Sequence, residues 1–377
     1  MTIKTLRGLP RPLKKLQHDY QLLQKVGFTS SIIRLIDDRR NPLSDYCQPF
    51  QPHPASKAII QSARQFCIDH GIWLDNAQHY ITCQLFLYPT ASYERMLVMT
   101  KNNAIDYYLN DTYGRDLFKS LSEAQQGAAA AVIERMSHLN ENMYLIADAQ
   151  PVERANAKML AEIRDSSPKA WFSEFLRLYN YHLEVTHRNC NTSALGFVPD
   201  VAQYVDMRYH TSGMPHIVLL LEYAEANFLD WGWLNDTALA PSLQRLHWLI
   251  AAFGCLSNDL FSFEKEVIDN GADANLLAAI ALNEPSWQLT EVIYHAATMV
   301  KNILREYFDL LSGMRKQVKD LSVAFPVESS GINQHLDCIE RCVQASWMWQ
   351  VHTQRYKRVN SIWEETQLPE PAILKAV

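Results

Sequence analysis

A polar stripe that continues an apolar helix constrains this chain more than any other stretch. Residues 246–253 (LHWLIAAF) are almost wholly apolar, and residues 258–266 (NDLFSFEKE) follow soon after. Asn258, Ser262 and Glu266 are spaced four residues apart, which places their side chains on one face of a helix. We predict that this face lines a cavity; an ordinary solvent-facing polar face is the alternative.

The three side chains of this stripe carry ligands that suit magnesium. Amide, hydroxyl and carboxylate oxygens are hard donors that Mg²⁺ accepts. With one carboxylate among three ligands, the ion keeps most of its positive charge. An anion would complete such a site, and a diphosphate is the natural candidate. Lys265 lies beside the stripe and is placed to reach the same anion.

A second polar stretch, residues 106–116 (DYYLNDTYGRD), ends a predicted helix that begins near Ala91. Its acidic side chains repel one another on a buried face unless a cation lies among them. We predict that Asp111 and Asp116 flank a metal at the mouth of the cavity. The alternative is a solvated helix end in which Arg115 supplies the counter-charge.

A third stretch carries a candidate phosphate ligand. Arg208 lies between Tyr204 and Thr211 at near-helical spacing. Its planar guanidinium suits phosphate oxygens, and a surface ion pair is the alternative. Gly213 and Pro215 follow closely and predict a helix break that exposes backbone groups in a cavity wall.

The composition predicts an all-α protein with a large core. Of 377 residues, 48% are hydrophobic and only 12 are glycine, and the apolar residues recur mostly at helical spacing. Several prolines interrupt residues 1–55, which we expect to form an irregular N-terminal arm. We expect residues 56–377 to form a single helical domain. Its last helices are predicted at 276–283, 287–320 and 331–360.

Charge and cysteine content exclude several classes of protein. The net charge of −6 gives no support for nucleic-acid binding. No run approaches the roughly 20 apolar residues of a membrane span, and the N-terminus lacks the apolar core of a secretory signal. The seven cysteines are scattered and are predicted to be free thiols, as expected of a cytoplasmic protein. The histidine pairs His182 and His187, and His210 and His216, lack zinc spacing and are interpreted as structural.

Taken together, these stretches resemble the class I terpene synthases of the bacterial type, over roughly residues 54–358. Asn258-Asp-x2-Ser262-x3-Glu266 is similar to the second metal motif of that family, and Asp111-x4-Asp116 to its aspartate-rich motif. The remaining similarities are Tyr204-x3-Arg208-x2-Thr211 to the diphosphate-sensor segment and Arg355-Tyr356 to the terminal Arg-Tyr pair. All four follow the family's order. Thr112 departs from the pattern, since the family usually has a second Asp there.

The resemblance implies a helical bundle around a central apolar cavity. Three Mg²⁺ ions are expected between the Asp111 and Asp116 side and the Asn258, Ser262 and Glu266 side. Arg208, Lys265, Arg355 and Tyr356 are expected to bind the diphosphate and to help close the site. The cavity wall should be apolar and aromatic because ring faces stabilise a cation without attacking it. The candidate wall residues are Phe86, Tyr108, Phe253, Trp347 and Trp349.

The substrate implied by the resemblance is a linear prenyl diphosphate. We expect the C20 compound geranylgeranyl diphosphate, cyclised to a diterpene or diterpene alcohol, with the C15 compound farnesyl diphosphate as the alternative. No dedicated general base is evident, and the released diphosphate can take the proton. A prenyl-chain elongating synthase and a non-catalytic interaction protein are the competing hypotheses, and a homodimer is left open.

Overall fold

The computed structural model describes residues 10–37, 42–47, 50–75, 77, 81–114 and 121–368. Its helices and two short strands are, in chain order, α1 (Pro10–Lys25), α2 (Ile32–Ile36), α3 (Leu43–Cys47), α4 (Ser56–Asp69), α5 (Cys83–Leu87), α6 (Tyr93–Tyr113), α7 (Glu123–Ser137), α8 (Pro151–Asp165), α9 (Lys169–Thr186), α10 (Thr192–Leu195), α11 (Val201–Thr211), α12 (Met214–Ala224), α13 (Trp231–Asp236), α14 (Ala240–Phe263), the π-helix η4 (Glu264–Asp269), α15 (Leu276–Asn283), α16 (Leu289–Leu321), α17 (Pro326–His352), the 3₁₀ turn η5 (Gln354–Tyr356), β1 (Arg358–Val359), the 3₁₀ turn η6 (Glu364–Thr366) and β2 (Gln367–Leu368). The predicted all-α class is confirmed.

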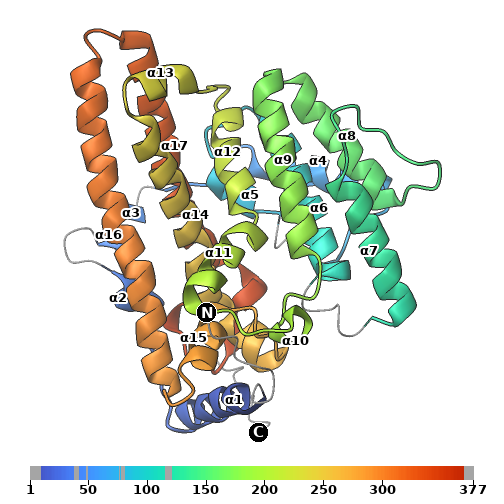
Figure 1. The fold of residues 1–377 in the computed structure, drawn as a ribbon, viewed down its shortest axis with the longest axis vertical. Coiled ribbons are helices and arrows are strands. Elements are labelled where there is room, and N and C mark those ends of the chain that lie inside the picture. The colour runs from blue at the N-terminus through green and yellow to red at the C-terminus, as the bar shows by residue number, and fades with distance from the viewer. Residues whose placement is uncertain are drawn as a thin grey trace, which may run out of the picture.

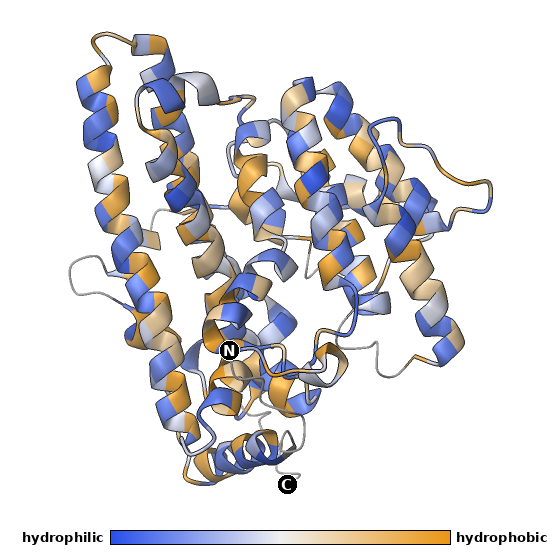
Figure 2. Ribbon diagram, viewed as in Figure 1, coloured by the Kyte–Doolittle hydropathy of each residue, from blue (hydrophilic) through white to orange (hydrophobic). Residues whose placement is uncertain are grey.

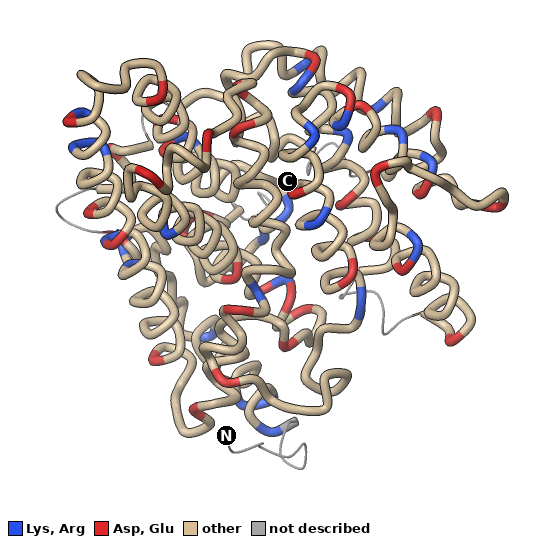
Figure 3. The backbone as a smooth tube through the Cα atoms, turned by 45° about the horizontal axis from the view of Figure 1, so that its top comes forward, with Lys and Arg blue, Asp and Glu red and all other residues tan. Residues whose placement is uncertain are grey.

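Helix α14 lies at the centre of the bundle, and almost all of its second half is buried. It packs against α11, α12, α15, α16 and α17. On the other side of the molecule, α6 packs between α4 and α8, and α7 and α8 pack against α9 (Figure 1). Hydrophobic and hydrophilic residues alternate along helices such as α16, which is typical of helices with one face in the core (Figure 2). Acidic and basic residues are interspersed along the chain (Figure 3).

The N-terminal stretch differs from the expected irregular arm. Helix α1 begins at Pro10, and its residues Leu16 and Tyr20 are only 2% exposed. Helix α1 packs against α15 and α16, α2 against α16, and α3 against α17. The prolines misled the prediction because the first turn of a helix tolerates proline: its N–H groups have no intrahelical partner.

Several predicted boundaries are confirmed. Helix α15 spans residues 276–283, α16 spans 289–321, and the predicted break falls between α11 and α12, where Gly213 has a φ of +75°. The last long helix, by contrast, ends at His352 and not near residue 360. All seven cysteines are unpaired, as predicted. In the part of the chain that the structure describes, no helix has both the length and the apolar character to cross a membrane.

A buried carboxyl in α12 makes the stability of this fold depend on pH. Glu222 is 1% exposed, and its Oε2 accepts a hydrogen bond from Leu229 N at 3.0 Å. Burial raises the pKa of Glu222 to about 7 from its ordinary 4.5. Between these pH values the unfolded chain loses this proton before the folded chain does, so stability falls as the pH rises.

We therefore expect Glu222→Gln to be stabilising above pH 7, by up to about 3 kcal/mol relative to the wild type, and to have little effect near pH 4.5. Urea unfolding of both proteins between pH 4.5 and 8 measures the difference. Glu134→Gln, an exposed site on α7, is the control and should show no such trend. A stability difference between Glu222→Gln and wild type that does not change with pH would contradict the assignment.

Candidate active site

A single cavity collects most of the polar residues that the sequence analysis selected. It encloses about 1010 Å³ of space, its opening to solvent included, and is lined by residues of α5, α6, α9, α11, α12, α14, η4, α17 and η5. Arg208, Asn258, Glu266, Arg355 and Tyr356 all line it. Segments as far apart in the chain as α5 and η5 thus meet around one hollow, and this is the candidate active site.

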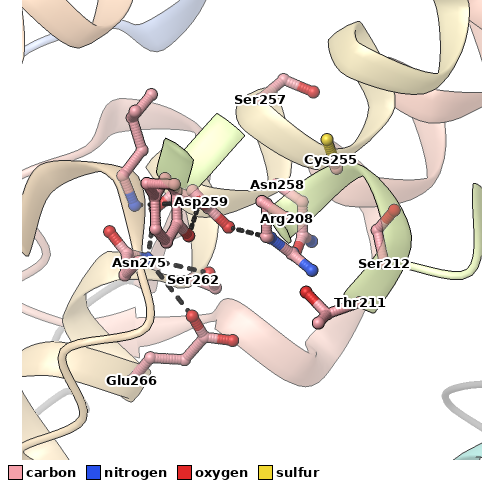
Figure 4. A network of polar contacts seen from close by, with 12 residues as sticks. Arg208, Thr211, Ser212, Cys255, Ser257, Asn258, Asp259, Ser262, Glu266 and Asn275 are labelled. Atoms are coloured by element: carbon pink, nitrogen blue, oxygen red, sulfur yellow. Dashed lines mark hydrogen bonds and ion pairs between the residues drawn. The ribbon is translucent and has the colours of Figure 1, made fainter. Parts of the chain in front are cut away.

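The predicted stripe lies on α14 and the π-helix that continues it. Asn258 and Ser262 are on α14, and Glu266 is on η4. Asn275 holds the lower part of the stripe together, because its Nδ2 lies 3.5 Å from Ser262 Oγ and 3.2 Å from Glu266 Oε2 (Figure 4). The helical spacing therefore does bring these oxygens to one side, as predicted.

The π-helix is fixed by a carboxylate that the sequence analysis did not select. Glu264 Oε1 accepts hydrogen bonds from Tyr20 Oη at 2.6 Å and from Ile362 N at 3.0 Å, and Oε2 accepts one from Ser361 Oγ at 2.5 Å. Helix α1 and the C-terminal segment are thus both tied to the residue two positions before Glu266. No local pattern indicates these partners, which are about 100 and 240 residues away.

Arg208 is held by a buried carboxylate and not by a surface ion pair. Its Nε donates to Asp259 Oδ1 at 2.8 Å, and Asp259 is fully buried (Figure 4). Asp259 Oδ2 accepts from Tyr204 Oη at 2.5 Å and from Leu276 N at 2.9 Å. Burial opposes the charge on Arg208, but Asp259 outweighs it and keeps the pKa of the guanidinium well above its ordinary value. Arg208 is therefore a fixed cation in the cavity wall.

Arg208 and the C-terminal pair meet at Asn258. Arg208 Nη2 donates to Asn258 Oδ1 at 3.1 Å, and Asn258 Nδ2 donates to Tyr356 Oη at 2.8 Å and to Gln350 Oε1 at 3.2 Å. Burial raises the pKa of Tyr356, so its hydroxyl stays protonated. Arg355 and Tyr356 lie on η5, just beyond the end of α17, rather than on the helix predicted for them.

Asp111 lies near the end of α6 and is not among the residues that line the cavity. Its Oδ1 is 3.6 Å from Nη2 of Arg355, which does line the cavity, so Asp111 lies close to the cavity beside this arginine. Asp116 lies outside the described residues. Lys265 is half-buried on η4 and is not among the residues that line the cavity.

A part of the cavity wall is more polar than predicted. Asp106, His182 and His187 all line the cavity. Asp106 Oδ1 lies 2.7 Å from His182 Nε2 and 3.2 Å from His187 Nε2. Burial alone would raise the pKa of Asp106, but the two histidines hold it well below its ordinary value; burial lowers the pKa of His187. The interpretation of these histidines as merely structural missed their place in the cavity.

The predicted aromatic wall is confirmed for only one of its five candidates. Trp349 lines the cavity, whereas Tyr107, not its neighbour Tyr108, supplies the ring from α6. Trp347 packs against Phe261 instead, with ring centroids 5.2 Å apart. Phe86 and Phe253 are likewise not among the lining residues. Leu87, Met214 and Ile217 provide apolar surface in their place.

The donor set of the stripe fits a magnesium site. Asn258 and Glu266 line the cavity, and Ser262 is tied to Glu266 through Asn275, so that three oxygen-bearing groups share one side. Such hard oxygen donors with one carboxylate are the set that Mg²⁺ takes when a phosphate supplies further ligands. Asp111, which lies beside Arg355, would supply a second carboxylate.

Comparison with models of protein families matches residues 101–306 to terpene synthase family 2, C-terminal metal binding. The chain belongs to this family. It is accordingly a terpene synthase, a lyase that acts on prenyl diphosphates, as the sequence motifs predict. The matched region holds Asp111, Arg208 and the whole stripe from Asn258 to Glu266.

Individual relatives are distant, and some of them cover most of the synthase. It is 22% identical over 330 residues to (+)-eremophilene synthase of Sorangium cellulosum, covering 85% of this chain and 92% of the relative. Over 182 residues it is 19% identical to the sesquiterpene cyclase hepA of Aspergillus oryzae, covering 48% of this chain and 47% of the relative. The fold matches linalool/nerolidol synthase from Streptomyces clavuligerus, solved with 2-fluorogeranyl diphosphate, with a TM-score of 0.66 at 16% identity, covering 81% of this chain and 97% of that one.

Proposed function

We propose that this synthase converts the C15 substrate farnesyl diphosphate to a sesquiterpene, with release of diphosphate. The observation that carries the proposal is that Arg208, Arg355 and Tyr356 converge with the Asn258–Glu266 stripe on one cavity. A diphosphate needs both cations and hydrogen-bond donors, and these residues supply them from three separate segments. The C20 substrate expected from the sequence is replaced by the C15 alternative, because a relative is named as a sesquiterpene cyclase.

Each polar group has a role in this proposal. Arg208 and Arg355 bind diphosphate oxygens, and the Tyr356 hydroxyl donates a hydrogen bond to them. Asn258, Ser262 and Glu266, together with the predicted ligands Asp111 and Asp116, would hold the expected three Mg²⁺ ions. Bound there, magnesium would supply the Lewis-acid chemistry that stabilises the leaving diphosphate.

Three further residues complete the proposed site. Lys265 remains a predicted diphosphate ligand, although it does not line the cavity in this structure. Trp349 and Tyr107 present aromatic rings to the cavity, where a ring face stabilises a cation by about 0.5–2 kcal/mol. With water excluded, the allylic cation survives long enough to cyclise.

We expect purified enzyme with Mg²⁺ to convert farnesyl diphosphate to a terpene at least about tenfold faster than the C10, C20 or C25 diphosphates, and EDTA to abolish the reaction. Diphosphate release measures the rate, and GC-MS identifies the products. A higher rate with the C20 substrate would restore geranylgeranyl diphosphate as the substrate. An elongated diphosphate, or no turnover with any of the four, would overturn the proposed function.

A further inference from the structure

The cluster of Asp106, His182 and His187 is part of the cavity but separate from the proposed metal ligands. Asp106 precedes Asp111 by five residues on α6, which is about 7.5 Å along the helix axis. It therefore lies about one and a half turns away from the end of the site where the diphosphate would bind. A substrate anchored at that end would bring its hydrocarbon chain toward this cluster.

The two histidines hold the Asp106 carboxylate in one orientation. When Asp106 is ionised, its Oδ1 accepts hydrogen bonds from both Nε2 atoms, at 2.7 Å from His182 and 3.2 Å from His187. His182 is itself fixed, because its Nδ1 lies 2.9 Å from Thr186 Oγ1 and 3.3 Å from the His210 carbonyl oxygen. The orientation of the carboxylate is thus set by residues of α9 and the end of α11.

Packing at the helix break keeps His182 in place. Gly213, at the break between α11 and α12, sits against this ring: a Cβ there would lie 3.1 Å from His182 Cε1 and 2.9 Å from His216 Cε1. The positive φ of Gly213 and the lack of a side chain allow the break and the histidine to share this space. The cluster is therefore built into the wall and is not a mobile surface group.

Asp106 is the most exposed member of the cluster. The side chains of His182 and His187 are 4% and 0% exposed, whereas that of Asp106 is 27% exposed. Asp106 Oδ2 forms no hydrogen bond with any residue that the structure describes. It is also not buried, so a molecule in the cavity can contact it. This oxygen accordingly faces the space that the hydrocarbon chain would fill.

We propose that Asp106 is the base that ends the reaction, removing a proton from the final carbocation at a position fixed by His182 and His187. The inference rests on the proposed function. Asp106 touches the reacting molecule and is the catalytic residue, while the two histidines are positioning residues. The carboxylate also attracts positive charge toward its own part of the wall, which selects the cation that is deprotonated.

The step balances without any further reactant. The C–H bond next to the cationic carbon breaks, and its electron pair forms the C=C double bond that neutralises the cation. The proton moves to Asp106 Oδ2 and passes to the released diphosphate or to water when the cavity opens. A carbocation is a far stronger acid than a carboxylic acid, so even a weakly basic carboxylate suffices.

Asp106→Asn tests the proposal because it keeps the size of the side chain and removes the basic oxygen. With farnesyl diphosphate we expect diphosphate release to stay within about tenfold of wild type, since ionisation depends on other residues. The main wild-type hydrocarbon should fall at least about fivefold as a share of total product, replaced by other alkenes or by alcohols. His187→Gln should shift the products in the same direction by a smaller amount, and it provides a second test if Asp106→Asn does not fold.

Glu184→Gln, an exposed site on α9 beside the cluster, is the matched control and should leave the product mixture unchanged. The inference is overturned by an unchanged product mixture in Asp106→Asn, by loss of diphosphate release beyond about tenfold, or by a wild-type product that is an alcohol. A wild-type enzyme that releases no diphosphate from any of the four substrates would instead refute the proposed function, and the inference with it.

Discussion

Replacing Glu266 with alanine is expected to lower the rate of magnesium-dependent diphosphate release by about 10³-fold or more. Glu266 carries the only carboxylate among the three aligned oxygen-bearing groups and lines the cavity. Without it, Asn258 and Ser262 offer only neutral oxygens to a doubly charged ion, which binds phosphate sites through at least one carboxylate. Diphosphate release at several magnesium concentrations measures the loss, and high magnesium should restore part of the rate.

Two further variants make this test specific. Glu266→Asp keeps the charge but shortens the side chain, so its rate should lie between those of wild type and Glu266→Ala. Glu134→Ala, which removes an exposed carboxylate from α7, should behave as wild type. If Glu266→Ala stays folded and releases diphosphate within a few-fold of the wild-type rate, the stripe is not the metal site.

The parts of the site that could be predicted are those set by spacing within one segment. A spacing of four residues places Asn258, Ser262 and Glu266 together on one face of a helix, whatever surrounds it. The break near Gly213 could be predicted for the same reason, because glycine and proline act on their own backbone. The order of the four motifs then sufficed to predict the family and the helical bundle.

The contacts that hold these groups in place could not be predicted, because they join distant segments. Spacing puts Asp259 about 100° away from Asn258 around the helix. It does not predict that Arg208 donates a hydrogen bond to Asp259. Asp106 and His182 are 76 residues apart, and Glu264 is tied to Tyr20 at a separation of 244. Pro10 was interpreted as a helix breaker although it begins α1. Only tertiary packing decides such cases.

Replacing Asp259 with alanine is expected to destabilise the fold by about 3–5 kcal/mol, the cost of leaving a buried charge without its partner. Asp259 is fully buried and accepts hydrogen bonds from Arg208, Tyr204 and the backbone of Leu276. Its removal leaves the Arg208 guanidinium, which is 6% exposed, unpaired within the bundle. Urea unfolding monitored by circular dichroism measures the loss, and Asp206→Ala, an exposed acid on α11, is the control.

A double variant separates the cost of the unpaired charge from the cost of lost packing. If the charge dominates, Asp259→Ala combined with Arg208→Met should recover much of the stability, since no buried cation remains. The double variant should still be inactive, because it lacks the Arg208 guanidinium that would bind the diphosphate. Tyr204→Phe removes one hydrogen bond to the same carboxylate and should cost about 1 kcal/mol. Equal stability of Asp259→Ala and wild type would mean that Asp259 does not stabilise the buried charge of Arg208. Another group would then have to pair with this guanidinium.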